Sequence, residues 1–316
     1  MKRYCQFAFL LLLCAPALAH ATDRDSATQR ATEPLPKLAF DKKGKLTNKE
    51  DLDRICRQLA MKPQTVVVFM HGWHGSAAPN DHSVVSFQNA LAEVRRRSFQ
   101  KSGRTLTGIL LTWHAEYLPG LADYPMYYFS QGRANAVARG DGIVTAIARL
   151  SKAVDRGNRE HFIVAGHSLG GRILGHVAGY HPELLRNVDL WLLANAADNA
   201  KVCQHTIDEV NNHPYRRGRL PKLVWVTSIQ DWATGFAYRL ANLSKAPGWE
   251  KKLRSHEVRI YKPTPTHPTY SADVDKVSDA TGAYAHNLIV LKGLGNHGDV
   301  WSEPMIQVVD YYVLHQ

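Results

Sequence analysis

The sequence has little cysteine, no low-complexity tract, and only one distinct apolar run outside the strand-like segments, a short one at its N-terminus. A single apolar run excludes a protein with several membrane-spanning helices. Four cysteines in 316 residues exclude a small disulfide-stapled scaffold. With 22 glycines, 15 prolines and 21% charged residues, the chain is neither collagen-like, nor a coiled coil, nor wholly disordered. A chain of this length can bury a large core without a staple.

Metal-ligating and nucleic-acid-binding patterns are also absent. His71 and His74 lie close together, but no third and fourth ligands follow at zinc-like spacing, so we expect no metal and no cofactor. No arginine-rich arm or aromatic-basic motif points to nucleic acid. The formal net charge of +11 leaves two interpretations open. One is peripheral contact with an anionic membrane surface, and the other is a set of ordinary solvated basic faces.

The N-terminus has the pattern of a secretory signal peptide. Lys2 and Arg3 precede an apolar stretch at 7–13, which is too short to span a bilayer. Small residues allow cleavage after Ala19 or after Ala21. We therefore expect a protein exported to a periplasm or to the outside of the cell.

Two cysteines remain once the signal is removed. Cys5 and Cys14 leave with the signal peptide, and Cys56 and Cys203 stay in the mature chain. An exported protein permits a disulfide between them, but contact cannot be read from sequence. The sequence is compatible both with a Cys56–Cys203 disulfide and with two free thiols.

The rest of the sequence divides into a polar leader at 22–47 and one α/β domain at 48–316. Apolar, strand-like runs occur at 65–70, 107–113, 162–165, 188–194, 223–228 and 286–292. Helical patterns occur at 48–59, 83–97, 132–154 and about 304–314. Strands that alternate with helices at this spacing predict a mostly parallel sheet with helices on both faces.

The most informative motif is Gly-His-Ser-Leu-Gly-Gly at 166–171, between a buried strand and a helix. In a G-x-S-x-G motif the serine sits on a sharp strand-to-helix turn. We expect Gly166 and Gly170 to be glycines because the turn leaves no room for a Cβ. Ser168 is then the candidate nucleophile. The N–H of Leu169, at the start of the helix, points toward an oxyanion.

With this motif and His-Gly-Trp at 71–73, the chain resembles the α/β-hydrolase superfamily, and lipases and esterases in particular. Residues 112–148 are similar to a segment of poorly characterised bacterial members. The resemblance covers about residue 64 to the end. It implies an eight-stranded core, of which six strands are clear in the sequence. It also implies that the loop after the first strong strand supplies an oxyanion N–H, for which Trp73 is the candidate.

A nucleophilic serine needs a base held by an acid, in the chain order Ser, Asp or Glu, His. His297, in a glycine-rich loop after the last strand, is the preferred base over His286, which begins that strand. Asp231, three residues past a strand, is the preferred acid. Asp198, one strand earlier, is the alternative.

Aromatic-rich segments at 114–131 and 236–275 are candidate caps over the site. The sequence thus predicts an exported serine hydrolase that cleaves carboxylic esters, with a small-molecule or lipid ester as substrate. Two alternatives stay open. One is a catalytically silent hydrolase fold that binds a component of the cell envelope, and the other is an acyltransferase that uses the same site.

Overall fold

The computed structural model describes residues 34–73, 75, 77–99, 104–115, 123–156, 160–213, 222–228, 258–261, 286–291, 297–298, 300–303, 305–306 and 309. Contacts divide the chain into two units, Met1–Pro34 and Leu35–Gln316. Apart from Pro34, every described residue belongs to the second unit. The predicted signal peptide lies outside the described residues.

The second unit is built on one eight-stranded sheet in the order β1-β3-β2-β4-β5-β6-β8-β7. The strands are β1 (Lys37–Phe40), β2 (Thr65–Met70), β3 (Leu106–Trp113), β4 (His161–His167), β5 (Leu190–Ala194), β6 (Lys222–Ser228), β7 (Val258–Tyr261) and β8 (His286–Leu291). All neighbouring strands pair in parallel. This confirms the predicted α/β class and its parallel sheet.

The central strands β2, β4 and β5 are buried along their whole length because both faces of the sheet are covered. In β2 all six residues are buried. Val66 and Val68 pack in one core cluster, whereas Val67 and Phe69 pack in the other. The strand therefore contributes alternate side chains to two separate hydrophobic layers.

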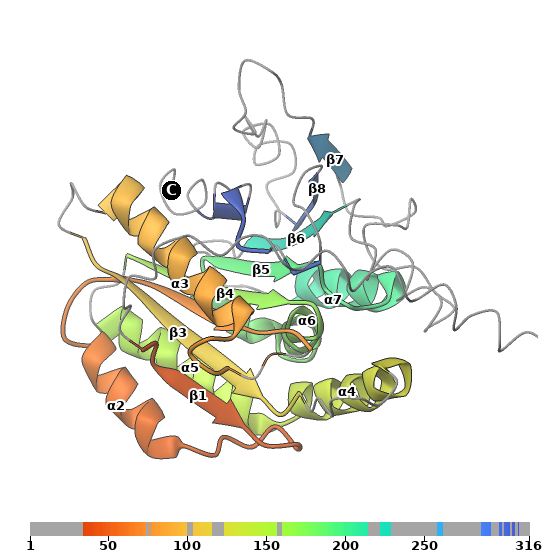
Figure 1. Ribbon diagram of the computed structural model, residues 1–316, viewed down its shortest axis with the longest axis horizontal. Coiled ribbons are helices and arrows are strands. Elements are labelled where there is room, and N and C mark those ends of the chain that lie inside the picture. Colours follow the sequence, from red (N-terminus) through yellow and green to blue (C-terminus); the bar gives the residue numbers. More distant parts are fainter. Residues whose placement is uncertain are drawn as a thin grey trace, which may run out of the picture. The chain divides into compact units, whose positions relative to one another are not determined.

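Helices cover the two faces unequally (Figure 1). They are α2 (Lys49–Leu59), α3 (His82–Val94), α4 (Asp123–Ala138), α5 (Asp141–Arg156), α6 (Leu169–Tyr180) and α7 (Ala200–Asn212), with a π-helical turn η2 (Arg95–Phe99) and a 3₁₀ turn η3 (Pro182–Asn187). The core cluster on one face includes side chains of α2, α5, α6 and α7. The cluster on the other face holds α3 and buried residues between 300 and 309.

The helix predicted over 132–154 is in fact two helices, α4 and α5. The break falls at Gly140, where an added Cβ would overlap the Lys43 carbonyl and lie 2.8 Å from the Cα of Gly44. Gly44 itself has a positive φ of 76°. A tight turn after β1 therefore packs directly on the junction of the two helices, a tertiary contact that the helical pattern does not report.

Two predicted boundaries need correction. β1 lies inside the predicted leader 22–47 and pairs with β3, so the domain predicted to begin at residue 48 extends back at least to Lys37. β7 lies inside the candidate cap 236–275 but pairs in parallel with β8 at the edge of the sheet. Both are four-residue edge strands, which lack the long apolar run that marks a central strand.

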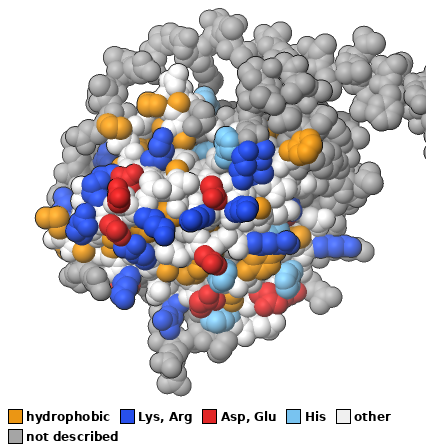
Figure 2. Space-filling model, turned by 90° about the horizontal axis from the view of Figure 1, so that it is seen from below, with side chains coloured by type: hydrophobic (Ala, Val, Ile, Leu, Met, Phe, Trp, Pro, Cys, Tyr) orange, Lys and Arg blue, Asp and Glu red, His pale blue; other side chains and the backbone are white. Residues whose placement is uncertain are grey.

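Basic and acidic side chains are interspersed on the face seen from below (Figure 2). Arg149 of α5 pairs with Asp53 of α2 at 2.5 Å, and Arg54 pairs with Asp51 at 2.7 Å. Such exposed pairs contribute little to stability, typically about 0–1 kcal/mol each. No helix within the described ranges is long and apolar enough to cross a membrane.

Candidate active site

The candidate site lies at the edge of the sheet where the parallel strands end. The 71–73 loop follows β2, and Ser168 follows β4. Met70 pairs with Gly166, so both segments leave the sheet at the same level. His286, by contrast, is the first residue of β8. A six-residue strand separates it from the site edge by about 20 Å, which disfavours it as the base.

Ser168 occupies the sharp turn between β4 and α6. Its backbone angles are φ 52° and ψ −121°, a conformation that costs a non-glycine residue on the order of 1–3 kcal/mol. The turn is held from both sides. Ser168 N donates to the Ala194 carbonyl at 3.0 Å, and the Ser168 carbonyl accepts from Arg172 N at 3.0 Å and from Ala197 N at 3.1 Å.

The glycines that flank the serine are required by close approach, as the motif predicts. A Cβ on Gly166 would lie 2.8 Å from the Gly170 carbonyl oxygen. A Cβ on Gly170 would overlap the carbonyl oxygens of Met70 and His71. The helix that follows the serine therefore packs directly on the backbone at the end of β2.

The 71–73 loop lies against the serine. A Cβ on Gly72 would be 2.8 Å from the Cβ of Ser168. His71 is fully buried, and its Nδ1–H donates to the Gly72 carbonyl at 2.9 Å. Burial lowers the pKa of His71, which keeps the ring neutral at pH 7. Trp113 Nε1 donates to the His71 carbonyl at 3.0 Å, so the loop is fixed by hydrogen bonds.

The predicted nucleophile and base are brought together. His297 Nε2 lies 2.8 Å from Ser168 Oγ, across 129 positions of sequence. Ser168 is buried and His297 is half-buried. At this distance the hydroxyl can donate its proton to a neutral imidazole, which is the geometry that a general base requires.

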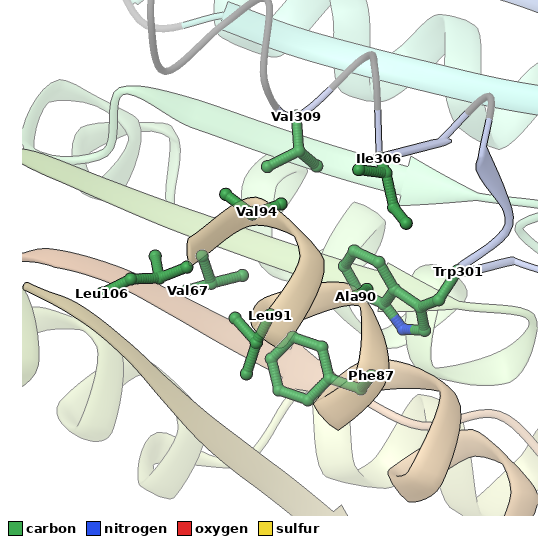
Figure 3. Close-up of a pocket in the computed structure, with 9 residues that line it drawn as sticks. All are labelled: Val67, Phe87, Ala90, Leu91, Val94, Leu106, Trp301, Ile306 and Val309. Atoms are coloured by element: carbon green, nitrogen blue, oxygen red, sulfur yellow. The ribbon is translucent and has the colours of Figure 1, made fainter. Parts of the chain in front are cut away.

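The segment after His297 is anchored on α3. The Trp301 ring meets Phe69 edge-on and lies tilted against Phe87, with centroids 5.1 and 5.0 Å away. With Ile306 and Val309, it lines a small apolar pocket between α3 and the sheet, whose lining is drawn in Figure 3. This pocket belongs to the core beneath α3, and the Ser168–His297 contact is not part of its lining.

Asp198, the alternative acid, belongs to a buried ion pair. Its Oδ1 accepts from Arg172 Nη1 at 2.7 Å and from the Asn199 N–H at 2.8 Å. His176 Nε2 lies 2.9 Å from Oδ2 but without the alignment of a hydrogen bond. Arg172 also donates through Nε to Asn135 Oδ1 at 2.8 Å. The carboxylate thus already has a cationic partner. Asp231, the preferred acid, lies outside the described residues.

Cys56 and Cys203 are not joined by a disulfide. Cys56 in α2 is half-buried, and Cys203 in α7 is buried. Of the two expectations held open, the disulfide is therefore not formed in this structure. Burial raises the pKa of the Cys203 thiol well above its usual range. Within the described part of the chain, no group of three or more His, Cys, Asp or Glu could hold a metal ion.

Part of the first candidate cap is helical. α4 begins at Asp123, and Tyr127 meets Trp73 edge-on with ring centroids 5.5 Å apart. Trp73, the predicted oxyanion donor, therefore packs against this helix. Residues 116–122, and most of the second candidate cap, lie outside the described residues.

Two residues near the serine were not predicted. His167, the residue before Ser168, donates through Nε2 to the His297 carbonyl at 2.8 Å. Asn195, with a positive φ of 43°, places Nδ2 at 3.5 Å from the same carbonyl. Asn195 directly follows an apolar strand in the sequence, as Ser168 and His71 do. Its position at the end of a strand is the feature of the sequence that could have identified Asn195 as a residue near the site.

No family model and no curated protein sequence matches the chain. Solved structures similar to it include Est1E from Butyrivibrio proteoclasticus, with 11% identity, 80% of this chain and 87% of that chain covered, and a TM-score of 0.38. The siderophore hydrolase EstA from Aspergillus nidulans has 13% identity, 80% and 83% coverage, and a TM-score of 0.42. The fluorophosphonate-binding serine hydrolase FphF from Staphylococcus aureus has 14% identity, 80% and 85% coverage, and a TM-score of 0.35. The function proposed below rests on the geometry around Ser168 and not on these similarities.

Proposed function

We propose that the protein is a serine hydrolase of the α/β-hydrolase type that cleaves carboxylic esters. The observation that carries the proposal is the 2.8 Å contact between Ser168 Oγ and His297 Nε2 on a strained turn at the end of β4. A strained, buried serine in contact with an imidazole is costly to maintain for packing alone, and strain of this kind concentrates at functional sites.

In the proposed reaction Ser168 Oγ attacks the acyl carbon of the ester while His297 Nε2 takes its proton. The N–H groups of Leu169 and Trp73 stabilise the negative oxygen of the tetrahedral intermediate, each by a few kcal/mol. The intermediate collapses, and His297 returns the proton to the leaving alcohol. Water then attacks the acyl carbon and loses a proton to His297. The second tetrahedral intermediate breaks its bond to Ser168 Oγ, which takes that proton back from His297, and the acid product leaves.

We propose Asp231 as the acid that orients His297. The contacts of Asp198 support this choice, because its charge is neutralised by Arg172 at 2.7 Å. If Asp231 is the acid, substitutions of the two aspartates should affect different properties. Asp231→Asn should lower kcat by about 10⁴-fold in a folded protein. Asp198→Asn should mainly lower the free energy of unfolding, since it leaves Arg172 buried without its partner.

We also propose that the protein works after export, on small-molecule or lipid esters. The signal-like N-terminus and the aromatic pair of Tyr127 with Trp73, which is next in the chain to Gly72, motivate this proposal. Peripheral contact with an anionic membrane is part of it. The mixture of both charges on the face in Figure 2 makes that contact weak, and raised salt should abolish it.

The first test is labelling with a fluorophosphonate, which reacts with an activated serine. The adduct should map to Ser168, and the same protein should turn over nitrophenyl esters. Ser168→Ala should lose the label and at least about 1,000-fold in kcat/KM. Ser151→Ala is the matched control, because Ser151 is an equally buried serine in α5, and it should retain both.

The outcomes separate the alternatives. Label and turnover that survive Ser168→Ala would overturn the mechanism. A folded protein with neither label nor turnover would favour the silent, envelope-binding reading. Product analysis with an added alcohol or amine acceptor separates a hydrolase from an acyltransferase by the partition of the acyl group. At millimolar acceptor a hydrolase should pass the acyl group mainly to water, whereas an acyltransferase should pass it mainly to the acceptor.

A further inference from the structure

His167 lies between the two loops that meet at Ser168. It is buried, and it is the last residue of β4. On one side a Cβ on Gly72 would lie 3.1 Å from its Nδ1. On the other side its ring centroid is 4.8 Å from that of His297. One imidazole therefore contacts the backbone of the candidate oxyanion loop and the loop that carries the candidate base.

The contact with the base loop is directed at the backbone of His297. His167 Nε2 lies 2.8 Å from the His297 carbonyl oxygen. A carbonyl can only accept, so Nε2 of His167 must carry the proton of this bond. Asn195 Nδ2, at 3.5 Å from the same oxygen, adds a longer second contact. These two side chains come from the ends of the adjacent strands β4 and β5.

The tether matters because Gly298, next to the proposed base, makes few contacts with the described residues. Gly298 is exposed, and none of the described residues lies within 4 Å of a Cβ added there. Among the described residues, the hydrogen bond to the His297 carbonyl is therefore a main contact that holds this backbone. A displacement of about 1 Å at a reacting group can cost on the order of 100-fold in rate.

We propose that His167 is a positioning residue, whose Nε2–H holds the His297 carbonyl and so keeps His297 Nε2 within reach of Ser168 Oγ. The inference rests on the proposed function, since it assigns a role toward the proposed base. The side chain at this variable position of the G-x-S-x-G motif then acts on the base, through its loop, and not on the substrate.

The test compares three substitutions that differ in reach. In His167→Gln the amide nitrogen is as many bonds from Cα as Nε2 of histidine, so it can donate to the same carbonyl. In His167→Asn the amide is one bond shorter, and His167→Leu has no donor. We expect kcat for a nitrophenyl ester to fall by about 10- to 100-fold in the Asn and Leu variants, with KM little changed. His167→Gln should stay within about 3-fold of the wild type. His161→Gln, a buried histidine at the other end of β4, is the control.

A double-mutant cycle with His297→Ala separates positioning from a general structural effect. With imidazole added as an external base, His167→Leu should cause no further loss in the His297→Ala background. An equal fold-loss in both backgrounds would overturn the inference. Equal activity of the His167→Gln and His167→Asn variants would also overturn the inference. This comparison still tests the inference if His167→Leu does not fold. If Ser168→Ala and His297→Ala abolish activity but His167→Asn does not lower kcat, the proposed function stands and this inference fails.

Discussion

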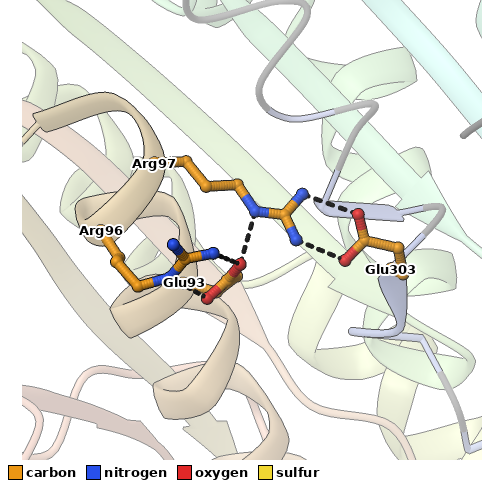
Figure 4. Close-up of polar contacts among 4 residues, drawn as sticks. All are labelled: Glu93, Arg96, Arg97 and Glu303. Carbon is orange, nitrogen blue, oxygen red and sulfur yellow. Dashed lines mark hydrogen bonds and ion pairs between the residues drawn. The ribbon is translucent and has the colours of Figure 1, made fainter.

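Arg97 and Glu303 form a two-pronged ion pair between the π-helical turn after α3 and the segment that follows His297. Arg97 Nη1 and Nη2 donate to the two carboxylate oxygens of Glu303 at 2.6 and 2.7 Å (Figure 4). Glu93 also accepts from Arg97 and Arg96, so four side chains form one network. Together with Trp301, this network holds the segment that follows His297 against α3.

Trp301→Ala should lower the free energy of unfolding by about 3–5 kcal/mol, because it empties the space that its ring fills against Phe69 and Phe87. It should also lower kcat, because the segment after His297 loses its anchor. Urea unfolding and ester kinetics measure the two effects. Trp301→Phe is the control. Trp301 Nε1 has no hydrogen-bond partner among the described residues, so phenylalanine removes no polar contact and should cost less. Equal losses for Ala and Phe would contradict this account.

Glu93 should make stability depend on acidity. Hydrogen bonds from Arg96 and Arg97 lower the pKa of its carboxyl from 4.5 to about 2. A lowered carboxyl pKa stabilises the fold at a pH above about 4.5, and that contribution is lost as the pH falls toward about 2. Because the side chain is 27% exposed, solvent screens the pair, and we expect no more than about 1 kcal/mol.

The measurement is urea unfolding of the wild type and Glu93→Gln at several pH values. The difference in the free energy of unfolding should shrink as the pH falls through this range. Glu50→Gln, at an exposed position of α2, controls for the loss of one carboxylate. A difference that does not vary with pH would refute the prediction.

Two glycine substitutions should have opposite effects on stability. Gly170→Ala places a methyl group on the carbonyl oxygens of Met70 and His71, so it should destabilise the fold and displace Ser168. A Cβ added at Gly132 in α4 has none of the described residues within 4 Å, so Gly132→Ala should stabilise the fold by up to about 1 kcal/mol through helix propensity. Thermal melting of both variants checks the pair. A neutral Gly170→Ala would mean that α6 can move away from the end of β2.

Cys203 should resist thiol reagents in the folded protein. It is buried, and burial raises the pKa of its thiol, so almost no thiolate forms at pH 7. Ellman's reagent should therefore modify Cys203 only after unfolding. Cys203→Ala should leave the native labelling of the chain unchanged and remove one thiol from the count in urea. Loss of a native label in that variant would show that Cys203 is accessible.

Much of this architecture could be predicted because its signals are local. The apolar run at 65–70 coincides with β2, and the strand–glycine–helix pattern around Ser168 coincides with the turn between β4 and α6. His297 could be predicted from chain order, because parallel strands bring their carboxyl ends to one edge.

Other features depend on contacts that a local pattern does not contain. The break at Gly140 depends on a turn almost one hundred positions earlier in the chain, and the edge strands β1 and β7 are too short to stand out. The hydrogen bond from His167 to the His297 carbonyl joins residues 130 positions apart. The ion pair of Arg172 with Asp198 likewise becomes visible only once α6 and the end of β5 are adjacent.

Because Ser168 and His297 lie 129 positions apart, their contact can form only late in the synthesis of the chain. β8, which leads to His297, pairs with β6 and β7, so it joins the sheet after the central strands exist. A nascent chain that has reached only β6 already holds the serine and the 71–73 loop, but it lacks the imidazole. Under the proposed mechanism, a chain that ends after β6 would therefore hold Ser168 without its proposed base and should show no hydrolysis.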